Sequence, residues 1–216
     1  MSGILDLLNS DIGKQMIGGI SQETHQPADK TASVVTMALP ILLGAMKRNA
    51  STESGAAGLM SALDNKHDGS ILDNLGGLFG GGVNEDVKID GMGILGHVLG
   101  GSQDNAVRAV SKKSGMDASS VMQVLQVAAP IILGFLGKEK KKQNISSSSG
   151  LGDLLGGLLG GGGQQQPAKQ QTLIESLLDG DDDGSVIDDI AGMVLSGGGN
   201  KSQGGLGGLL GGLFGK

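Results

Sequence analysis

Two long segments of the chain are apolar on nearly every side. VVTMALPILLGAM, residues 34–46, aligns without a gap with VLQVAAPIILGFL, residues 124–136, at an offset of 90 residues. A segment that leaves no polar face is typical of a helix buried on all sides. The pattern therefore predicts two central buried helices, at about 28–48 and 118–138.

A proline lies within each of these segments, Pro40 in the first and Pro130 in the second. Inside a helix, proline removes one backbone donor and crowds the carbonyl four residues earlier, which here belongs to Thr36 or Gln126. Two interpretations stay open. Each proline marks either a kink within one long helix or a break that divides two shorter helices.

Shorter helical patterns surround the central segments. Apolar spacing predicts a first helix in each unit, near 3–20 and near 92–112. Asp117, with Ser120 three residues later, is a predicted N-cap for the helix at 118–138. Third and fourth helices are predicted at 51–63 and 70–79 in the first unit, and at 170–178 and 185–195 in the second. Sustained alternation of apolar and polar residues, which would indicate strands, does not occur. The predicted fold is all-α, with two tandem pseudo-repeats of about four helices each.

An acidic turn occurs once in each unit. ALDNKHDGSILDNLGGL (62–78) aligns with LLDGDDDGSVIDDIAGM (177–193) at an offset of 115 residues. The shared glycine, serine and aspartate predict a tight turn, an N-cap, and an acid that the dipole of the following helix favours. These residues are Gly69, Ser70 and Asp73 in the first copy, and Gly184, Ser185 and Asp188 in the second.

The second copy also has the acid spacing with which calcium loops begin, at Asp179, Asp181 and Asp183. The first copy has Lys66 at the position of Asp181, and a lysine cannot bind a hard cation. The twelfth loop position, where a bidentate carboxylate is expected, is Ile190. Calcium binding, with help from Asp188 or Asp189, is therefore the alternative interpretation for the second copy only.

Two segments consist almost wholly of glycine and leucine. Their apolar residues follow the spacing of one helical face: Leu151, Leu154, Leu155, Leu158 and Leu159 in the first segment, and Leu206, Leu209, Leu210, Leu213 and Phe214 in the second. Glycine on the opposite face destabilises such a helix in isolation by about 1 kcal/mol per residue relative to alanine. We therefore expect segments that fold when they dock, onto the same chain, another copy or a membrane surface. A simple low-complexity tail is the remaining alternative.

The offsets of 90 and 115 differ by 25 residues, so the second unit contains an insertion. Its Lys, Ser, Gly and Gln content is typical of a linker. The predicted organisation is a first helical repeat (1–83), the first half of a second repeat (84–137), a linker (138–170), the second half of that repeat (171–199) and a Gly/Leu-rich C-terminal arm (200–216).

Composition and charge narrow the classes of function. A net charge of −6 argues against general nucleic-acid binding, and the lysines at 138 and 140–142 are expected to be a solvated helix end before the linker. The absence of cysteine fits a reducing compartment, and the N-terminus lacks the basic region of a signal peptide, so we expect a cytoplasmic protein. The apolar run 121–136 is shorter than the roughly 20 residues that span a bilayer. The Gly/Leu segments also lack the basic residues of a membrane-surface helix.

No catalytic pattern is found. The histidines are His25, His67 and His97, and no H-x-x-x-H, H-E-x-x-H or P-loop motif occurs. His67 is expected to be a solvated turn residue, since Asp182 stands at its position in the other copy, and His97 a core or boundary residue. We therefore expect neither an enzyme nor a cofactor.

Three features of the sequence resemble those of a known family. They are the motif [AL]-[AL]-P-[IL]-[IL]-L-G at 38–44, the motif D-G-S-[IV]-[LI]-D-[ND]-[LI] at 68–75 and 183–190, and the glycine–leucine ends. The chain resembles the bacterial YidB-like family, the domain of unknown function 937, over most of its length outside the linker. The resemblance implies an all-helical cytoplasmic protein without an assigned catalytic activity, and it carries over no functional residues.

The leading hypothesis is a non-enzymatic structural protein that forms a homo-oligomer through its helical repeats and Gly/Leu segments. A contact between two different surfaces of one molecule propagates into a ring, shell or filament. The alternatives are a calcium-responsive binding module and a carrier of small molecules or lipids.

Overall fold

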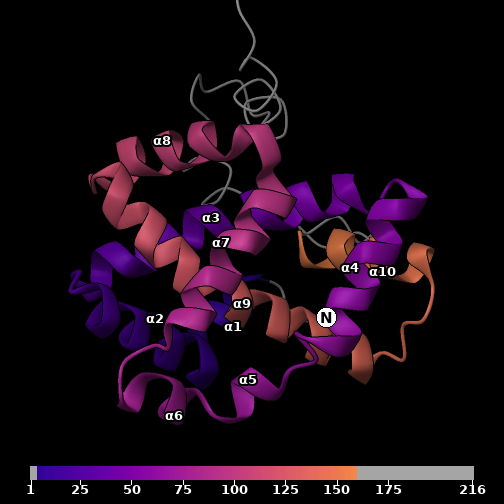
Figure 1. Cartoon of the computed structure of the whole chain (residues 1–216), viewed down its shortest axis with the longest axis horizontal. Helices are drawn as coiled ribbons and strands as arrows, with labels where there is room; N and C mark the ends of the chain where they lie inside the picture. Colours follow the sequence, from indigo (N-terminus) through magenta and orange to yellow (C-terminus); the bar gives the residue numbers. More distant parts are fainter. Residues whose placement is uncertain (1–3, 160–216) are drawn as a thin grey trace, which may run out of the picture.

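The computed structural model describes residues 4–159, with side chains from Leu7 onward. This part of the chain is all-helical and contains no strand (Figure 1). In chain order the elements are α1 (Ile4–Asn9), α2 (Asp11–Thr24), α3 (Ala28–Asn49), α4 (Glu53–Asn65), α5 (Ser70–Asp73), α6 (Leu75–Gly80), α7 (Glu85–Leu99), the 3-10 helix η1 (Gly100–Ser102), α8 (Gln103–Ser114), α9 (Ala118–Lys142) and α10 (Ser148–Leu158).

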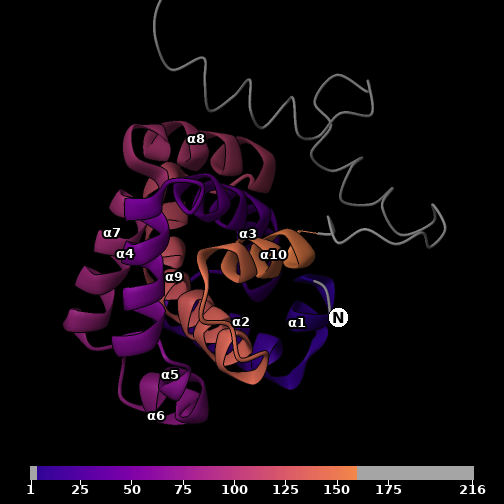
Figure 2. The ribbon, with the colours of Figure 1, turned by 90° about the vertical axis from the view of Figure 1, so that its right-hand side faces the viewer.

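The helix α9 is the centre of the fold. It contacts α2, α3, α4, α5, α7 and α8 (Figure 2). Its residues from Val127 to Gly134 are buried without interruption, as the all-round apolar pattern predicted. One hydrophobic core runs from Leu8 in α1 to Leu158 in α10. The regions before and after residue 84 therefore pack together.

Local signals explain where four of the helices begin. Ser10, Thr52, Asp117 and Ser147 each accept a hydrogen bond from the backbone N–H three residues later, which satisfies a donor that the helix leaves free. The predicted cap at Asp117 is thus confirmed. Three predicted helices are instead divided: 3–20 at Ser10, 92–112 at η1 and 70–79 at Asn74. The predicted helices 170–178 and 185–195 lie outside the described residues.

Both prolines lie inside continuous helices, Pro40 in α3 and Pro130 in α9. The alternative of a break into two shorter helices is therefore wrong, while the kink stays a prediction. Because Pro130 has no N–H, the Gln126 carbonyl lacks its usual helical partner. A Cβ on Gly91 of α7 would lie 1.8 Å from this oxygen, so only a glycine fits at this position. Gly91 thus allows the close crossing of α7 and α9.

Two helices are long and apolar enough to span a membrane by length and composition alone, α3 and α9. Within the most apolar stretch of 18 residues in each helix, 56% of the residues of α3 and 78% of those of α9 are buried inside the molecule. The core helix of a soluble protein passes the same test, so this finding is weak evidence for a membrane span.

The predicted linker 138–170 is structured over much of its length. Residues up to Lys142 belong to α9, and Ser148–Leu158 form α10, which packs on α3 and α4. The rest of this range, from residue 160, lies outside the described residues.

Candidate functional site

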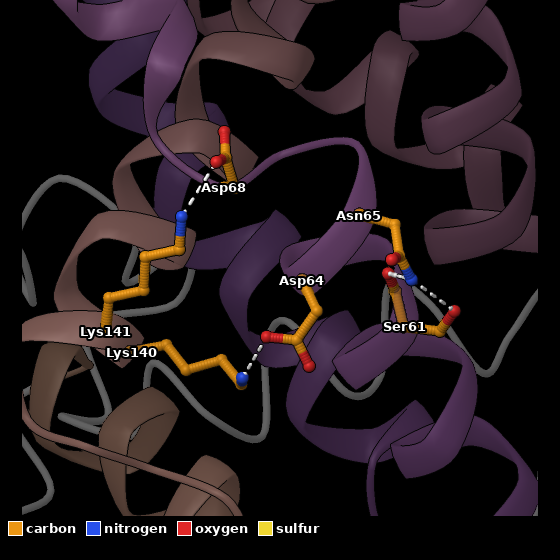
Figure 3. Close-up of polar contacts among 6 residues, drawn as sticks. All are labelled: Ser61, Asp64, Asn65, Asp68, Lys140 and Lys141. Atoms are coloured by element: carbon orange, nitrogen blue, oxygen red, sulfur yellow. Dashed lines mark hydrogen bonds and ion pairs between the residues drawn. The ribbon is translucent and has the colours of Figure 1, made fainter.

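The acidic turn of the first unit, residues 64–73, packs on the last turns of α9. Figure 3 shows Asp64 and Asp68 facing Lys140 and Lys141 across this contact. Two glycines of α9 permit it. A Cβ at Gly137 would lie 1.9 Å from the His67 carbonyl oxygen, and one at Gly134 would lie 2.4 Å from Cγ2 of Ile71. We call Gly134 and Gly137 the glycine surface of α9.

Three lysines beside the glycine surface each pair with one aspartate of the turn. The distances are 3.1 Å for Lys138 with Asp73, 2.5 Å for Lys140 with Asp64 and 2.7 Å for Lys141 with Asp68. The Lys140 side chain is 7% exposed, whereas those of Lys138 and Lys141 are about half exposed. A buried ammonium ion requires a partner, so the Lys140 pair matters most, while exposed pairs contribute little.

The expected solvated lysine end is therefore wrong for Lys140. Lys142 fits the expectation, because its side chain is 72% exposed and pairs only with Glu139 of the same helix. The other three lysines connect α9 to a segment that lies 65 to 76 residues earlier in the chain.

Asp68 is held in its ionised form. Its carboxylate accepts hydrogen bonds from Lys141 Nζ at 2.7 Å and from the Ser70 backbone N–H at 3.1 Å. These bonds, that from Lys141 first, hold the pKa of Asp68 well below its usual range.

The start of α5 differs from the prediction in one respect. Gly69, with φ of 103°, makes the turn as predicted, but it also occupies the N-cap position that was assigned to Ser70. Ser70 is the first helical residue, and its backbone N–H donates a hydrogen bond to the Asp68 carboxylate. Asp73 is the last residue of α5 and pairs with Lys138.

His67 of the acidic turn is buried, with 6% of its surface exposed, so the expectation of a solvated turn residue is wrong. Its Nε2 lies 3.6 Å from Asp90 of α7, and Lys66 pairs with the same aspartate. Burial lowers the pKa of His67, and nearby Lys66 adds to this, although Asp90 acts in the opposite direction. His97, expected at the core or its boundary, is exposed, and its Nδ1 lies 2.9 Å from the Gly93 carbonyl oxygen.

The lowered pKa of His67 predicts a pH dependence of stability. The unfolded chain binds a proton near pH 6.5, where the folded protein still keeps His67 neutral, so the free energy of unfolding falls as the pH drops below about 7. We expect the urea midpoint to fall from pH 7 to pH 5, and to fall less in His67→Gln. The exposed His97→Gln is the matched control and should keep the parental slope. Equal slopes in all three proteins would contradict the prediction.

The part of the chain that the structure describes offers no open set of carboxylates for a cation. Within residues 4–159, no group of three or more His, Cys, Asp or Glu is placed to hold a metal ion. The aspartates of the first turn face lysines instead. Asp179, Asp181 and Asp183, with Gly184, Ser185 and Asp188, lie outside the described residues, so calcium binding by the second copy stays a prediction.

The first Gly/Leu segment forms α10 and docks on its own chain. Leu151 and Leu155 are fully buried, and Leu154 and Leu158 are 2% and 8% exposed. Gly152 faces open space, and the Nζ of Lys47 lies over Gly156. Of the alternatives for this segment, docking within the chain is the one observed. These leucines are buried within this chain, and their predicted role between copies stays a prediction.

The second Gly/Leu segment lies outside the described residues. Its predicted self-association residues are Leu206, Leu209, Leu210, Leu213 and Phe214. Leu159, the last leucine of the first segment, follows α10 and is half-buried.

A polar groove of about 320 Å³ lies between the end of α2, the start of α7 and α9. Glu23 crosses it, accepting hydrogen bonds from Lys88 at 2.7 Å and from the Val83 N–H at 2.9 Å. Burial raises the pKa of Glu23, but these two bonds outweigh it and lower the pKa overall. Its charge is therefore matched by Lys88, as in a structural ion pair. An apolar cavity between α3, α9 and α10 holds about 10 Å³, against roughly 300–1,000 Å³ for ligand pockets.

Comparison with known proteins gives one match. A family described as bacterial protein of unknown function (DUF937) matches residues 6–139 and residues 141–216. The chain belongs to this family. The first DUF937 match includes both the acidic turn and most of the α9 end that receives it. The resemblance seen in the sequence is confirmed, and no curated protein or solved structure matches the chain.

The sequence of this DUF937 protein does not reveal the partners of the acidic turn. Gly137 and the three paired lysines were not connected with it, because contacts over such separations leave no local pattern. One signal was present. Asp64, Asp68 and Asp73 recur in the second copy as Asp179, Asp183 and Asp188. The three aspartates of the first copy are the ones that pair with the lysines of α9.

Proposed function

We propose that this protein is a non-enzymatic, self-associating helical scaffold, in which the C-terminal Gly/Leu arm, residues 200–216, docks on another copy. The observation that carries the proposal is α10, a Gly/Leu segment whose leucines are buried where the helix packs on α3 and α4. The arm repeats its register at an offset of 55: Leu206, Leu209, Leu210, Leu213 and Phe214 correspond to Leu151, Leu154, Leu155, Leu158 and Leu159. A peptide with this stripe has the apolar face that helix-in-groove binding uses.

The proposal includes the two tandem pseudo-repeats, which local structure supports. The Ser21 hydroxyl donates to the Gln26 carbonyl at 2.6 Å, and 90 residues later Ser111 donates to Met116 at the same distance. At the same offset, His25 and Gly115 both end a helix with positive φ, 55° and 67°. Two similar units in one chain present similar surfaces twice, which favours contacts that propagate from copy to copy.

Light scattering of the full chain beside a version that ends at Gly199 tests the proposal. We expect the full chain to form a particle several times heavier than its 21.6 kDa, and the shortened chain to remain near 20 kDa. The double substitution Leu210→Ser/Leu213→Ser keeps the length but removes the stripe, and should act like the truncation. Swapping the adjacent polar residues, Ser202→Gln/Gln203→Ser, is the matched control. A full chain that stays monomeric at high concentration would refute self-association.

A further inference from the structure

The surface of α9 that receives the acidic turn has a counterpart on α3. We call Ile131, Gly134 and Lys138 the α9 strip. The turn contacts two of these residues, since Ile71 occupies the space where a Cβ of Gly134 would stand and Lys138 pairs with Asp73, and Ile131 is 1% exposed.

The residues 90 positions earlier, Ile41, Gly44 and Arg48, form the α3 strip. Ile41 and Gly44 are partly exposed and Arg48 is exposed, although the aligned apolar positions of α9 are buried. A Cβ on Gly44 would meet no atom within 4 Å. Arg48 makes no side-chain ion pair with any residue of the described range 7–159. The α3 strip thus keeps three positions of the α9 contact surface without its covering segment, whereas Lys47, Ala50 and Ser51 stand where α9 has Gly137, Lys140 and Lys141.

We propose that the second acidic turn, residues 182–188, covers the α3 strip of the same chain. The turn lies outside the described residues, but its sequence repeats the first turn position by position: Val186 corresponds to Ile71, and Asp188 to Asp73. In the proposed contact Val186 packs over Gly44, and Asp188 pairs with Arg48. The inference rests on the pseudo-repeat correspondence and is independent of the Gly/Leu arm.

The differences between the two copies are complementary in charge. Gly137 of α9 lies against the backbone of His67, whereas α3 has Lys47 at the aligned position and the second turn has Asp182 in place of His67. Because Lys47 carries a Cβ, the second turn would lie farther from α3 at this point than the first turn lies from α9, with a lysine and aspartate pair in place of the close backbone contact. Asp182 would be unfavourable on α9, because it would replace the buried His67 next to Asp90. On α3 it would face a lysine. The second turn is therefore suited to α3 and not to the surface that the first turn occupies.

The connection within one chain is long enough. The helix α10 already packs on α3, and 23 residues, 160–182, separate its following residue Leu159 from Asp183. A segment of this length spans at most about 80 Å when fully extended. The same chain also presents the turn at a higher local concentration than a second copy does in dilute solution.

Engineered disulfides test the contact, because the chain has no cysteine of its own. The positive control is Gly134→Cys/Ile71→Cys, where a Cβ at 134 lies 3.9 Å from Ile71 Cβ, within the usual range of a disulfide. The test pair is Gly44→Cys/Val186→Cys. The negative control is Gly58→Cys/Val186→Cys, since Gly58 faces open space on α4. The full chain is oxidised, and free thiols, intact mass and mobility on a non-reducing gel are measured.

We expect the test pair to lose its free thiols at monomer mass within a few-fold of the rate of the positive control, and the negative control to keep them. Adding Arg48→Glu should slow closure a few-fold, because it replaces an exposed ion pair with a like-charge contact, and adding Asp188→Arg to that variant should restore it. A test pair no faster than the negative control, or one that joins two chains only, would overturn the proposal. Light scattering of the same samples reports self-association separately, so the two proposals fail independently.

Discussion

Replacing Gly91 by alanine should destabilise the protein by about 2–3 kcal/mol, even though alanine favours helices by about 1 kcal/mol. The added Cβ would stand 1.8 Å from the Gln126 carbonyl oxygen, and a backbone oxygen cannot rotate away as a side chain can. The helices α7 and α9 must therefore separate, and the core between them loses contact. The urea midpoint of the full chain measures the effect.

The same helix supplies the control. Gly93 lies two residues further along α7, and a Cβ there meets nothing within 4 Å. Gly93→Ala should therefore raise the free energy of unfolding by roughly 0.5–1 kcal/mol. If Gly91→Ala is as stable as Gly93→Ala, the close crossing of α7 and α9 does not exist in solution.

Replacing Leu155 by alanine should cost about 2–5 kcal/mol of the docking free energy of α10, because this fully buried side chain fills the contact with neighbouring helices. The helix lies near the end of the described chain and packs mainly on α3 and α4, so it can detach before the rest unfolds. Hydrogen exchange of the α10 amides should accelerate about thirtyfold or more.

Two variants separate docking from local helix propensity. Leu159→Ala removes a half-buried leucine just after α10 and should change exchange only slightly. Gly152→Ala adds a methyl group in open space and should slow exchange, because alanine stabilises the helix. Unchanged exchange in Leu155→Ala would mean that α10 does not dock within its own chain.

The elements that the sequence predicted best are those whose signal is local. The segments around Pro40 and Pro130 are apolar on all sides, and they form the two longest helices of the described chain. Asp117 lies directly before such a segment and caps it. Both signals act within one or two helical turns, so the sequence alone suffices to recognise them.

The contacts of the acidic turn depend on residues far away in the chain, and there the prediction failed. The environment of His67 is set by Asp90 and by the close approach of Gly137, neither of which belongs to its own turn. The lysines of α9 looked solvated because their aspartates precede them by 65 to 76 residues. In both cases tertiary packing decides the surroundings of a side chain, and periodicity along the chain does not reveal it.

The separation between the acidic turn and its lysines also affects synthesis. A growing chain lengthens by about 5–20 residues per second, so roughly 3–15 s pass between the synthesis of an aspartate and that of the lysine which holds it. During this interval the first six helices lack α9, the central helix of the core. The newly made N-terminal half therefore exposes apolar surface on the ribosome until α9 arrives, and this interval is when chaperones have most to bind.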